Sequence, residues 1–319
     1  MSHHQRQVSA FAPASMGNLS VGFDLLGAAL APIDPCAPFG DVVTVTAGEG
    51  IQLSCRGRYA SFLPATNNIV VRCAEHFMAQ FAPQCQGLTL TLDKNLPIGS
   101  GLGSSASSVV AALAALNRYF DEPLTAAELL QLMGELEGEI SGSVHFDNVA
   151  PSFLGGLQLM QANGAQTLPT FENWYWLVAY PGSTLSTAAM RALLPAQVDL
   201  STTITFGQHL ATFVAASFRQ DEATALTALT DVLAEPYRAD HIPNYHAARQ
   251  HLKALGFDAV GISGSGPTLF AVCRDEACAR QGQAYLEQQY LTNQYGLVRI
   301  CRLASQGVIY EESIANAVN

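Results

Sequence analysis

Three glycines in five positions, within the segment Pro97–Ser107, constrain this chain more than any other feature of its sequence. The segment reads PIGSGLGSSAS and lies between a strand-like stretch that ends near Leu92 and a helix-like stretch that begins at Ser104. Glycine lets a backbone turn sharply and approach a ligand closely. The first N–H groups of a helix and its positive dipole end attract an anion. We therefore expect a strand, a glycine turn and a helix arranged to hold phosphate.

The spacing of these glycines excludes the two commonest phosphate-binding loops. No GK[ST] follows, so the segment is not a Walker A motif, and its pattern is GxGxG rather than GxGxxG. The small side chains of Ser104, Ser105 and Ala106 leave the entrance open, and a serine hydroxyl can also coordinate a phosphate-bound Mg²⁺. Taken alone, the segment is also compatible with an ordinary Gly/Ser turn before a helix.

The charge of the chain argues against polymeric anions as ligands. Its 319 residues include 15 Lys+Arg and 26 Asp+Glu, a formal net charge of −11, and the lysines are Lys94 and Lys253 alone. Binding to nucleic acid or to an anionic membrane surface requires clustered cations. We therefore expect no nucleic-acid partner, no membrane partner, and an anionic ligand held by something other than bulk charge.

Targeting signals and cysteine usage indicate a cytoplasmic protein. The longest apolar run, Val109–Leu116, is far shorter than the roughly 20 residues that span a bilayer. The start, MSHHQRQVSAFAP, lacks the apolar region of a secretory signal. The absence of a CxxC pair favours buried free thiols in a reducing compartment over disulfides or zinc. The seven cysteines are Cys36, Cys55, Cys73, Cys85, Cys273, Cys278 and Cys301.

Strand-like and helix-like segments occur in both halves of the chain. Alternating β-formers predict strands at 41–46, 87–92, 157–160, 175–180, 259–262, 269–272 and 298–303. Helices are expected at 104–119, 125–139, 206–218, 223–233 and 245–255, the second opened by a capping-box pattern. The polar, turn-rich residues 163–169 suggest a domain boundary. The pattern predicts the α+β class, with two domains and a ligand crevice between them.

A second glycine cluster, Gly261–Thr268, lies between two of the expected strands in the distal half. Taken alone, it is more typical of a tight structural connection whose glycines permit positive φ. Together with the first glycine segment it suggests a second part of one site.

Three segments together resemble the GHMP small-molecule kinases. They are Phe11–Gly27 (FAPASMGNLSVGFDLLG), Pro97–Ser107 (PIGSGLGSSAS) and Gly261–Phe270 (GISGSGPTLF), which are spread from end to end of the chain. The first of them, with HFDNVAP at His145–Pro151 and EPYR at Glu235–Arg238, narrows the resemblance to the homoserine kinases within that family.

The resemblance implies a fold and a reaction. An N-terminal, ATP-binding domain similar to ribosomal protein S5 domain 2 would span residues 1–165, and a ferredoxin-like domain would span residues 166–319. ATP and substrate would lie in the cleft between them. The γ-phosphoryl group of ATP would pass to the side-chain hydroxyl of L-homoserine, giving O-phospho-L-homoserine for threonine synthesis. Enzymes of this family are cytosolic and commonly homodimers.

The same resemblance implies roles for individual residues. Glu137 in GELEG matches the magnesium carboxylate, and Ser105, or less favourably Ser104, would share the metal. Catalytic roles fall on Asn18, His145, Asn148 and Arg191. Substrate contacts fall on Asp24, Asn18, Asn148, Thr187, Arg191 and Arg238. ATP contacts fall on Pro97, Ile98, Gly99, Ser100, Gly101, Leu102, Gly103, Ser104, Ser105, Ala106 and Ser107.

The chemistry of these residues is compatible with such roles. Asp24 suits the α-ammonium group of an amino acid, and Arg191 and Arg238 can bind its carboxylate. An aspartate in the apolar run VGFDLLGAAL is costly unless it is used. Without the resemblance, Glu137 would be one of three solvated glutamates, and His145 would be a structural histidine.

The identity of a general base stays open. Asp147 in HFDN is the acidic candidate, but the resemblance does not assign it. Neither Lys94 nor Lys253 lies in a motif that would make it the partner of an aspartate. Our hypothesis is that no strong base operates and that the proton leaves late, to phosphate.

Two other functions stay open. One is another kinase of the same family, acting on mevalonate, a sugar or a different amino alcohol, although Asp24 with two arginines favours homoserine. The other is a ligand-sensing protein that has kept the fold and lost turnover, against which the intact glycines and Glu137 argue.

Overall fold

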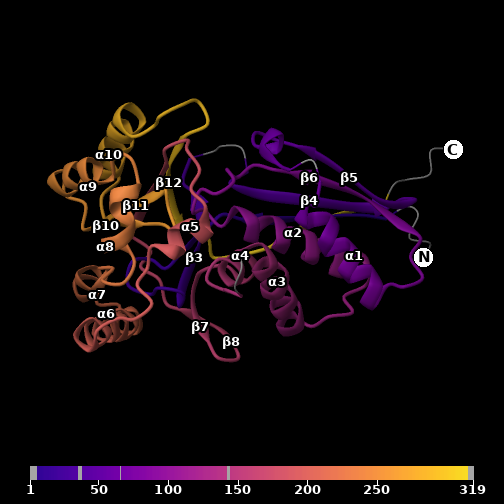
Figure 1. Ribbon diagram of the computed structural model, residues 1–319, viewed down its shortest axis with the longest axis horizontal. Coiled ribbons are helices and arrows are strands. Elements are labelled where there is room, and N and C mark those ends of the chain that lie inside the picture. The colour runs from indigo at the N-terminus through magenta and orange to yellow at the C-terminus, as the bar shows by residue number, and fades with distance from the viewer. Residues whose placement is uncertain (1–5, 35–37, 65, 142–143, 315–319) are drawn as a thin grey trace.

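The computed structural model describes residues 6–34, 38–64, 66–141 and 144–314 (Figure 1). The strands are β1 (Arg6–Pro13), β2 (Ser15–Gly17), β3 (Leu26–Pro32), β4 (Gly40–Ala47), β5 (Gly50–Arg56), β6 (Gly87–Asp93), β7 (Leu157–Gln161), β8 (Gly164–Leu168), β9 (Tyr175–Tyr180), β10 (Ala259–Ile262), β11 (Leu269–Cys273), β12 (Leu297–Leu303) and β13 (Ile309–Ile314). The α-helices are α1 (Ile69–Phe81), α2 (Ser104–Tyr119), α3 (Ala126–Ser141), α4 (Val149–Leu154), α5 (Thr187–Ala192), α6 (Leu200–Arg219), α7 (Glu222–Ala228), α8 (Glu235–Arg238), α9 (Tyr245–Ala254) and α10 (Glu276–Gln289). Short 3₁₀ helices are η2 (Ala60–Phe62) and η3 (Ala239–His241).

A five-stranded sheet forms the half of the molecule on the right of Figure 1, toward which both ends of the chain run. Its order is β13-β1-β4-β6-β5, and its neighbours are antiparallel except β5 and β6. Alternation along β1 buries Val8, Ala10 and Ala12 in one core with side chains of α1 and α2. Because one face is buried in this way, a slip of one residue would expose the apolar set, so the register is strongly specified.

The second sheet joins strands from both halves of the sequence. Its order is β10-β11-β9-β12-β3-β7-β8, and β2 also pairs with β3. Successive residues of β9 belong to two cores. Trp176 and Val178 pack with residues of α6 and α7, and Leu177 and Ala179 pack with residues of α9 and α10. Helices therefore cover both faces of this part of the sheet.

The chain crosses between the two halves more than once. Strand β12 pairs with β3, and the last strand, β13, then pairs with β1, where Arg6 lies opposite Ile314. Residue 165 lies inside the β7–β8 hairpin. The division of the domains into residues 1–165 and 166–319 therefore stays a prediction.

Most of the expected elements are confirmed within a residue or two. The helix α2 and the strand β9 have the predicted bounds, and the Thr125 N–H donates to Glu128 Oε2 at 2.9 Å, as in a capping box. Three expectations are wrong. The helix α6 begins at Leu200 rather than at residue 206, because Asp199 caps it there, and α7 ends at Ala228 rather than at residue 233. Residues 163–169 contain β8, because this polar segment pairs with β7 in an edge hairpin.

A buried ion pair fixes the start of α2. Lys94 directly follows β6 and donates to the carboxylate of Asp41 on β4, and both side chains are almost fully buried. Lys94 Nζ also donates to Ser104 O at 2.8 Å and to Ser108 Oγ at 2.9 Å. Asp41 Oδ1 accepts the N–H groups of the two residues after Lys94. Two strands are thus tied to the first turn of the helix.

No helix in the described part of the chain is both long and apolar enough to span a membrane. Cys36 lies outside the described residues, and Cys55, Cys73, Cys85, Cys273 and Cys278 are free thiols. The expectation of buried free thiols is confirmed for Cys73 and Cys273 and is wrong for Cys55, which is exposed.

We predict that Asp41→Asn lowers the free energy of unfolding by about 3–5 kcal/mol, because it leaves the buried ammonium group of Lys94 without a countercharge. The measurement is urea unfolding at pH 7. The control is Asp34→Asn, which breaks an exposed ion pair with Arg280 and should change stability little. Equal losses in the two variants would contradict the role given to the buried pair.

Candidate active site

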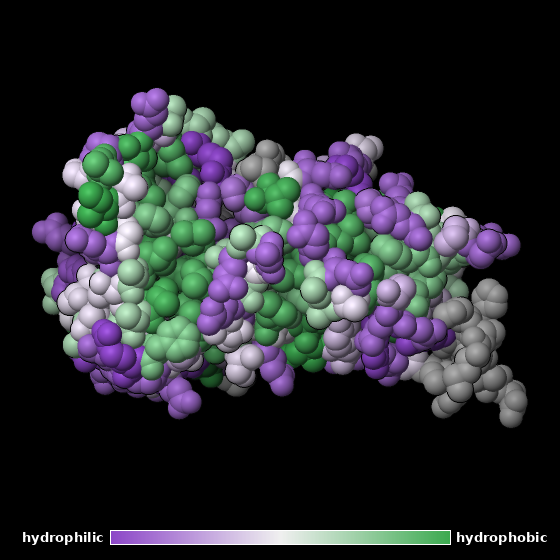
Figure 2. Space-filling model, turned by 90° about the horizontal axis from the view of Figure 1, so that it is seen from below, coloured by the Kyte–Doolittle hydropathy of each residue, from purple (hydrophilic) through white to green (hydrophobic). Residues whose placement is uncertain are grey.

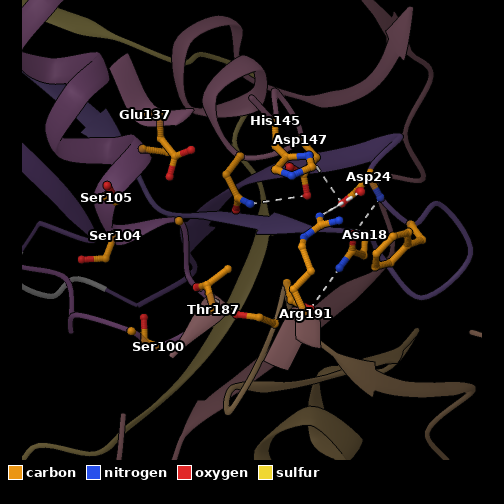
Figure 3. A pocket seen from close by; sticks show the side chains of 18 of the residues that line it. Asn18, Asp24, Ser100, Ser104, Ser105, Glu137, His145, Asp147, Thr187 and Arg191 are labelled. Carbon is orange, nitrogen blue, oxygen red and sulfur yellow. Dashed lines mark hydrogen bonds and ion pairs between the residues drawn. The ribbon is translucent and has the colours of Figure 1, made fainter. Parts of the chain in front are cut away.

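Most of the predicted site residues line one pocket at the N-terminus of α2 (Figure 3). Both halves of the chain contribute to it. The first half supplies the glycine loop, the turn after β2, α3 and the segment before α4. The second half supplies α5, α8 and the second glycine cluster. The predicted residues that line it are Asn18, Asp24, Gly99, Ser100, Gly101, Gly103, Ser104, Ser105, Ala106, Glu137, His145, Asn148, Thr187, Arg191 and Arg238.

Four residues of the predicted loop do not line this pocket. Ile98 lines an adjoining cavity, and Pro97, Leu102 and Ser107 are buried. The hydroxyl of Ser107 donates to a carbonyl oxygen of β1 at 2.8 Å. The buried side chains thus connect the loop to the protein core rather than to the pocket.

The glycine loop adopts backbone conformations that other residues take only with strain. Gly99, Gly101 and Gly103 have φ values of 60°, 82° and 62°, in the left-handed region. A Cβ atom on Gly103 would lie 2.1 Å from Ser15 Oγ. No side chain among the described residues caps α2, so the first N–H groups of this helix are left to face the pocket.

The second glycine cluster holds the first one in place. Ser263 Oγ donates to Gly101 O at 2.6 Å, and the Thr268 N–H donates to Ser100 O at 3.0 Å. A Cβ atom on Gly101 would lie 2.3 Å from the carbonyl oxygen of Ser263. The two glycine clusters, which are about half the chain apart in sequence, are therefore in direct backbone contact.

The turn that follows β2 carries two of the predicted residues in a strained backbone. Asn18, Leu19, Ser20 and Asp24 have φ values of 69°, 44°, 58° and 58°, which cost about 1–2 kcal/mol each for residues with a side chain. Asn18 Oδ1 accepts the Asp24 N–H at 2.9 Å, and Asn18 Nδ2 donates to Gly264 O at 3.0 Å. These bonds hold the turn in a conformation of the kind that clusters at binding sites.

One end of the pocket carries charges of both signs. Arg191 on α5 donates from one nitrogen to both carboxylate oxygens of Asp24, at 2.7 and 2.9 Å. Arg238 is 3% exposed and donates to two backbone carbonyl oxygens. The two guanidinium carbons lie 5.4 and 5.5 Å from the ring centre of Phe23, within the range of cation–π attraction. Three charged groups are thus held at fixed positions around one aromatic ring.

Two titratable groups beside this ion pair are shifted toward their neutral forms. Burial and the charge of Arg191 lower the pKa of His145, although Asp24 opposes them. Its Nδ1 lies 3.7 Å from Asp24 Oδ1. Burial, followed by the charges of Asp24 and Glu137, raises the pKa of Asp147 to about 7. The buried carboxyl of Asp147 therefore carries a proton in a large share of molecules at neutral pH.

The end of the pocket nearest α2 presents oxygen atoms that fit a magnesium ion. Ser105 Oγ is buried and has no hydrogen-bond partner among the described residues, whereas Ser104 Oγ donates to Leu96 O at 3.2 Å. The carboxylate of Glu137 lies beside Ser105 in Figure 3. Mg²⁺ prefers a few protein oxygens together with phosphate and water. In the described parts of the chain no group of three or more His, Cys, Asp or Glu could enclose an ion alone.

Three contributors to the site were not predicted from the sequence. Phe23 lies against both arginines, Ser15 Oγ donates to Asn148 Oδ1 at 3.1 Å, and Ser265 Oγ lies 3.3 Å from the hydroxyl of Thr187. Each of the three lies in one of the motif segments, next to or near a predicted residue. That position was the available signal, because none of the three has a side chain that indicates phosphate or amino-acid chemistry by itself.

Two family models match this chain. A family model described as the N terminal domain of GHMP kinases matches residues 68–156, and one described as GHMP kinases C terminal matches residues 214–292. The chain belongs to the GHMP kinase family. As predicted, its architecture is the two-domain α+β fold of GHMP kinases, which use ATP, generally with Mg²⁺.

Solved structures share the fold of this GHMP kinase over almost its whole length. The homoserine kinase from Cytophaga hutchinsonii is 28% identical, with a TM-score of 0.86 over 96% of this chain and 97% of that one. A putative homoserine kinase from Listeria monocytogenes is 20% identical, with a TM-score of 0.69 over 95% and 99% of the two chains. The L. major mevalonate kinase is 16% identical, with a TM-score of 0.64 over 92% and 95%. The last two likenesses concern the fold alone.

We predict that the free energy of unfolding of the Asp147→Asn variant increases relative to that of the wild type as the pH rises from 5 to 8. The folded protein holds the proton of Asp147 up to a pKa of about 7, whereas the reference value for the free side chain is 3.8. The stability that this carboxyl contributes is therefore present below about pH 4 and is lost as the pH rises through 7. Between these values the difference between the two proteins should grow by up to about 1.4 kcal/mol per pH unit.

The measurement is urea unfolding at pH 5, 6, 7 and 8, without nucleotide or divalent metal. A difference in unfolding free energy that stays constant over this range would contradict the raised pKa of Asp147.

Proposed function

We propose that this GHMP kinase transfers the γ-phosphoryl group of ATP to the side-chain hydroxyl of L-homoserine, forming O-phospho-L-homoserine. The observation that carries the proposal is the ion pair between Asp24 and Arg191, beside the buried Arg238 and in the same pocket as the glycine loop. In an organism that makes threonine from homoserine, this reaction supplies the phosphorylated precursor.

The Asp24–Arg191 pair favours a ligand that carries both charges. In the free protein each partner satisfies the other. A ligand with a carboxylate alone would draw Arg191 away and leave Asp24 half-buried without its partner, which is costly. An amino acid replaces both halves of the pair, because its ammonium group binds Asp24 while its carboxylate binds Arg191 and Arg238. Asn18 and Thr187 line the same space and supply neutral hydrogen bonds to the substrate.

The glycine loop is the natural site for the phosphates of ATP. Its backbone N–H groups and the uncapped start of α2 favour an anion without a lysine. The adjoining cavity shares Gly99, Ser104 and Ser105 with the first pocket and is lined by Leu63, Pro64 and Ile98. It is more apolar and suits the nucleoside. The nucleotide would thus extend from this cavity across the loop toward the amino acid.

Glu137 and Ser105 would hold the magnesium ion. When bound, Mg²⁺ would neutralise charge on the phosphate oxygens during transfer. The buried Ser105 hydroxyl, which lacks a partner in the described chain, supports this assignment over Ser104.

Positioning rather than a strong base accounts for the transfer. Asn18, His145 and Asn148 line the pocket and can hold the acceptor hydroxyl in line with the γ-phosphate. Asp147 is nearby, but its raised pKa makes it partly protonated at neutral pH. We propose that the hydroxyl proton leaves late and passes to the transferred phosphate.

We further place the reaction in the cytoplasm, where the free thiols of the chain stay reduced.

The experiment follows ADP release from ATP and Mg²⁺ with homoserine, serine, threonine, mevalonate and galactose as acceptors. We expect rapid turnover with L-homoserine, because its ammonium, carboxylate and hydroxyl groups match the three parts of the pocket. Preferred turnover of mevalonate or galactose would indicate a different GHMP kinase. No turnover with any of them would favour a binding protein that has lost catalysis.

The metal assignment predicts that Glu137→Gln lowers kcat at least about 100-fold, because a neutral amide binds Mg²⁺ poorly. The matched control is Glu135→Gln, the same change two residues earlier on α3, at an exposed side chain whose Oε1 accepts from Gln131. The control should keep wild-type kcat and the same dependence on Mg²⁺ concentration. Unchanged turnover in Glu137→Gln would contradict the assignment.

A further inference from the structure

An exposed apolar stripe runs along α6, which packs against the rest of the molecule with its opposite face. Phe213, Ala216 and Ser217 are buried. On the other face the exposed fractions of Leu200, Ile204 and Phe218 are 74%, 52% and 54%. In Figure 2, which shows the molecule from below, apolar side chains form a broad area over the half that carries α6 and α7 in Figure 1. Large exposed apolar patches mark interaction surfaces.

The stripe has the composition of an interface core rather than of a solvated face. From Leu200 to Phe218 the helix contains no Asp, Glu, Lys or Arg. Exposed helices normally carry such residues on the solvent face. In the middle of the stripe lie Gly207 and Ala211, both exposed, and a Cβ atom built on Gly207 meets nothing within 4 Å. The centre is therefore open to close approach by another backbone.

The stripe is symmetric about residue 209. Its six positions are separated by alternating steps of four and three residues, which keep them on one side of a helix that packs along another. They are the exposed Leu200, Ile204, Gly207, Ala211 and Phe218, together with Val214, which is half-buried and also packs against the core. Position 200 is as far from residue 209 as position 218, and the same holds for 204 with 214 and for 207 with 211. A surface that complements itself under a two-fold rotation is what an isologous dimer requires.

The charges at the two ends of α6 match the same arrangement. Asp199 caps the N-terminus, where its side chain accepts the Thr202 N–H, and Arg219 is the exposed last residue. Positions 199 and 219 are also equidistant from residue 209. In an antiparallel pair each Asp199 would therefore lie at the same level along the contact as the Arg219 of the other copy, whereas a parallel pair would place like charges at the same end.

We propose that α6 forms the two-fold contact of a homodimer, with the two copies of the helix antiparallel and crossing at Gly207 and Ala211. The bulky Leu200 of one copy packs against Phe218 of the other at each end of the contact. The small residues at the centre let the two helices approach to the lower end of the usual 8–10 Å range. This inference concerns assembly and holds whichever acceptor the kinase phosphorylates.

The first test is sedimentation equilibrium of the full chain. The wild type should be a dimer, and Phe218→Glu should raise the dimer dissociation constant at least about 100-fold, because it buries a charge in the contact. The matched control is Phe62→Glu, at a phenylalanine of similar exposure, 49%, outside α6, which should leave the dimer intact. A monomeric wild type, or equal effects of the two substitutions, would overturn the proposal.

A second variant, Gly207→Glu, guards against misfolding as an explanation. Open space surrounds this position, and glutamate is the better helix former, so the unfolding temperature of the variant should be at least that of the wild-type monomer while the dimer is lost. A Gly207→Glu protein that stays dimeric would overturn the proposed contact.

Cysteine cross-linking tests the antiparallel register. Positions 200 and 218 are 18 residues apart, which is about 27 Å along a helix. The double variant Leu200→Cys/Phe218→Cys should therefore form covalent dimers under mild oxidation, and neither single variant should exceed the wild-type background. Strong cross-linking in a single variant would instead show a parallel contact and overturn the register.

Discussion

The buried pair of Asp41 and Lys94 is the interaction on which the rest of the site depends. Lys94 ties the end of β6 to the first turn of α2 through Ser104 O and Ser108 Oγ, and Asp41 ties the same point to β4. Burying two charges stabilises a fold only when nearly all of their hydrogen-bonding capacity is used, as it is here. The pair fixes where the helix begins, and hence where the preceding glycines must turn. Lys94 thus packs under the glycine loop and fixes its position, and the backbone N–H groups of the loop are left for the proposed phosphate contacts.

Contacts from the distal half then complete the loop as a platform. Ser263 and Thr268 hold Gly101 and Ser100 from one side, and Asn18 joins the strained turn of Asp24 to Gly264. The proposed acceptor and phosphate sites are consequently parts of one hydrogen-bonded assembly. This assembly gives an acidic protein a way to bind a nucleotide: the net charge disfavours polymeric anions, while a helix terminus, a few placed arginines and the proposed metal site would act locally.

Features of the fold and of the candidate site that depend on neighbouring residues in the chain could be predicted from the sequence. The bounds of α2, the capping box at Thr125 and the glycine loop follow from residue order alone. The pairing of β13 with β1 could not be predicted, because it joins residues about 300 positions apart and strand patterns do not name their partners. The role of Lys94 was missed for a similar reason: its partner Asp41 lies 53 residues earlier. Motif resemblance brought Asp24, Arg191 and Arg238 together as candidates, but their ion pair and their contact with Phe23 required the fold.

The central claim is that the acceptor site exchanges its internal Asp24–Arg191 pair for a ligand that carries both charges. Calorimetric titration of the protein with L-homoserine, 4-hydroxybutyrate and 3-aminopropan-1-ol tests it most directly, because the last two compounds each lack one charged group. The account predicts that both fragments bind at least about 10-fold more weakly than homoserine, since each leaves one buried or half-buried charge unpaired. Binding of 4-hydroxybutyrate or 3-aminopropan-1-ol with the affinity of homoserine would contradict it.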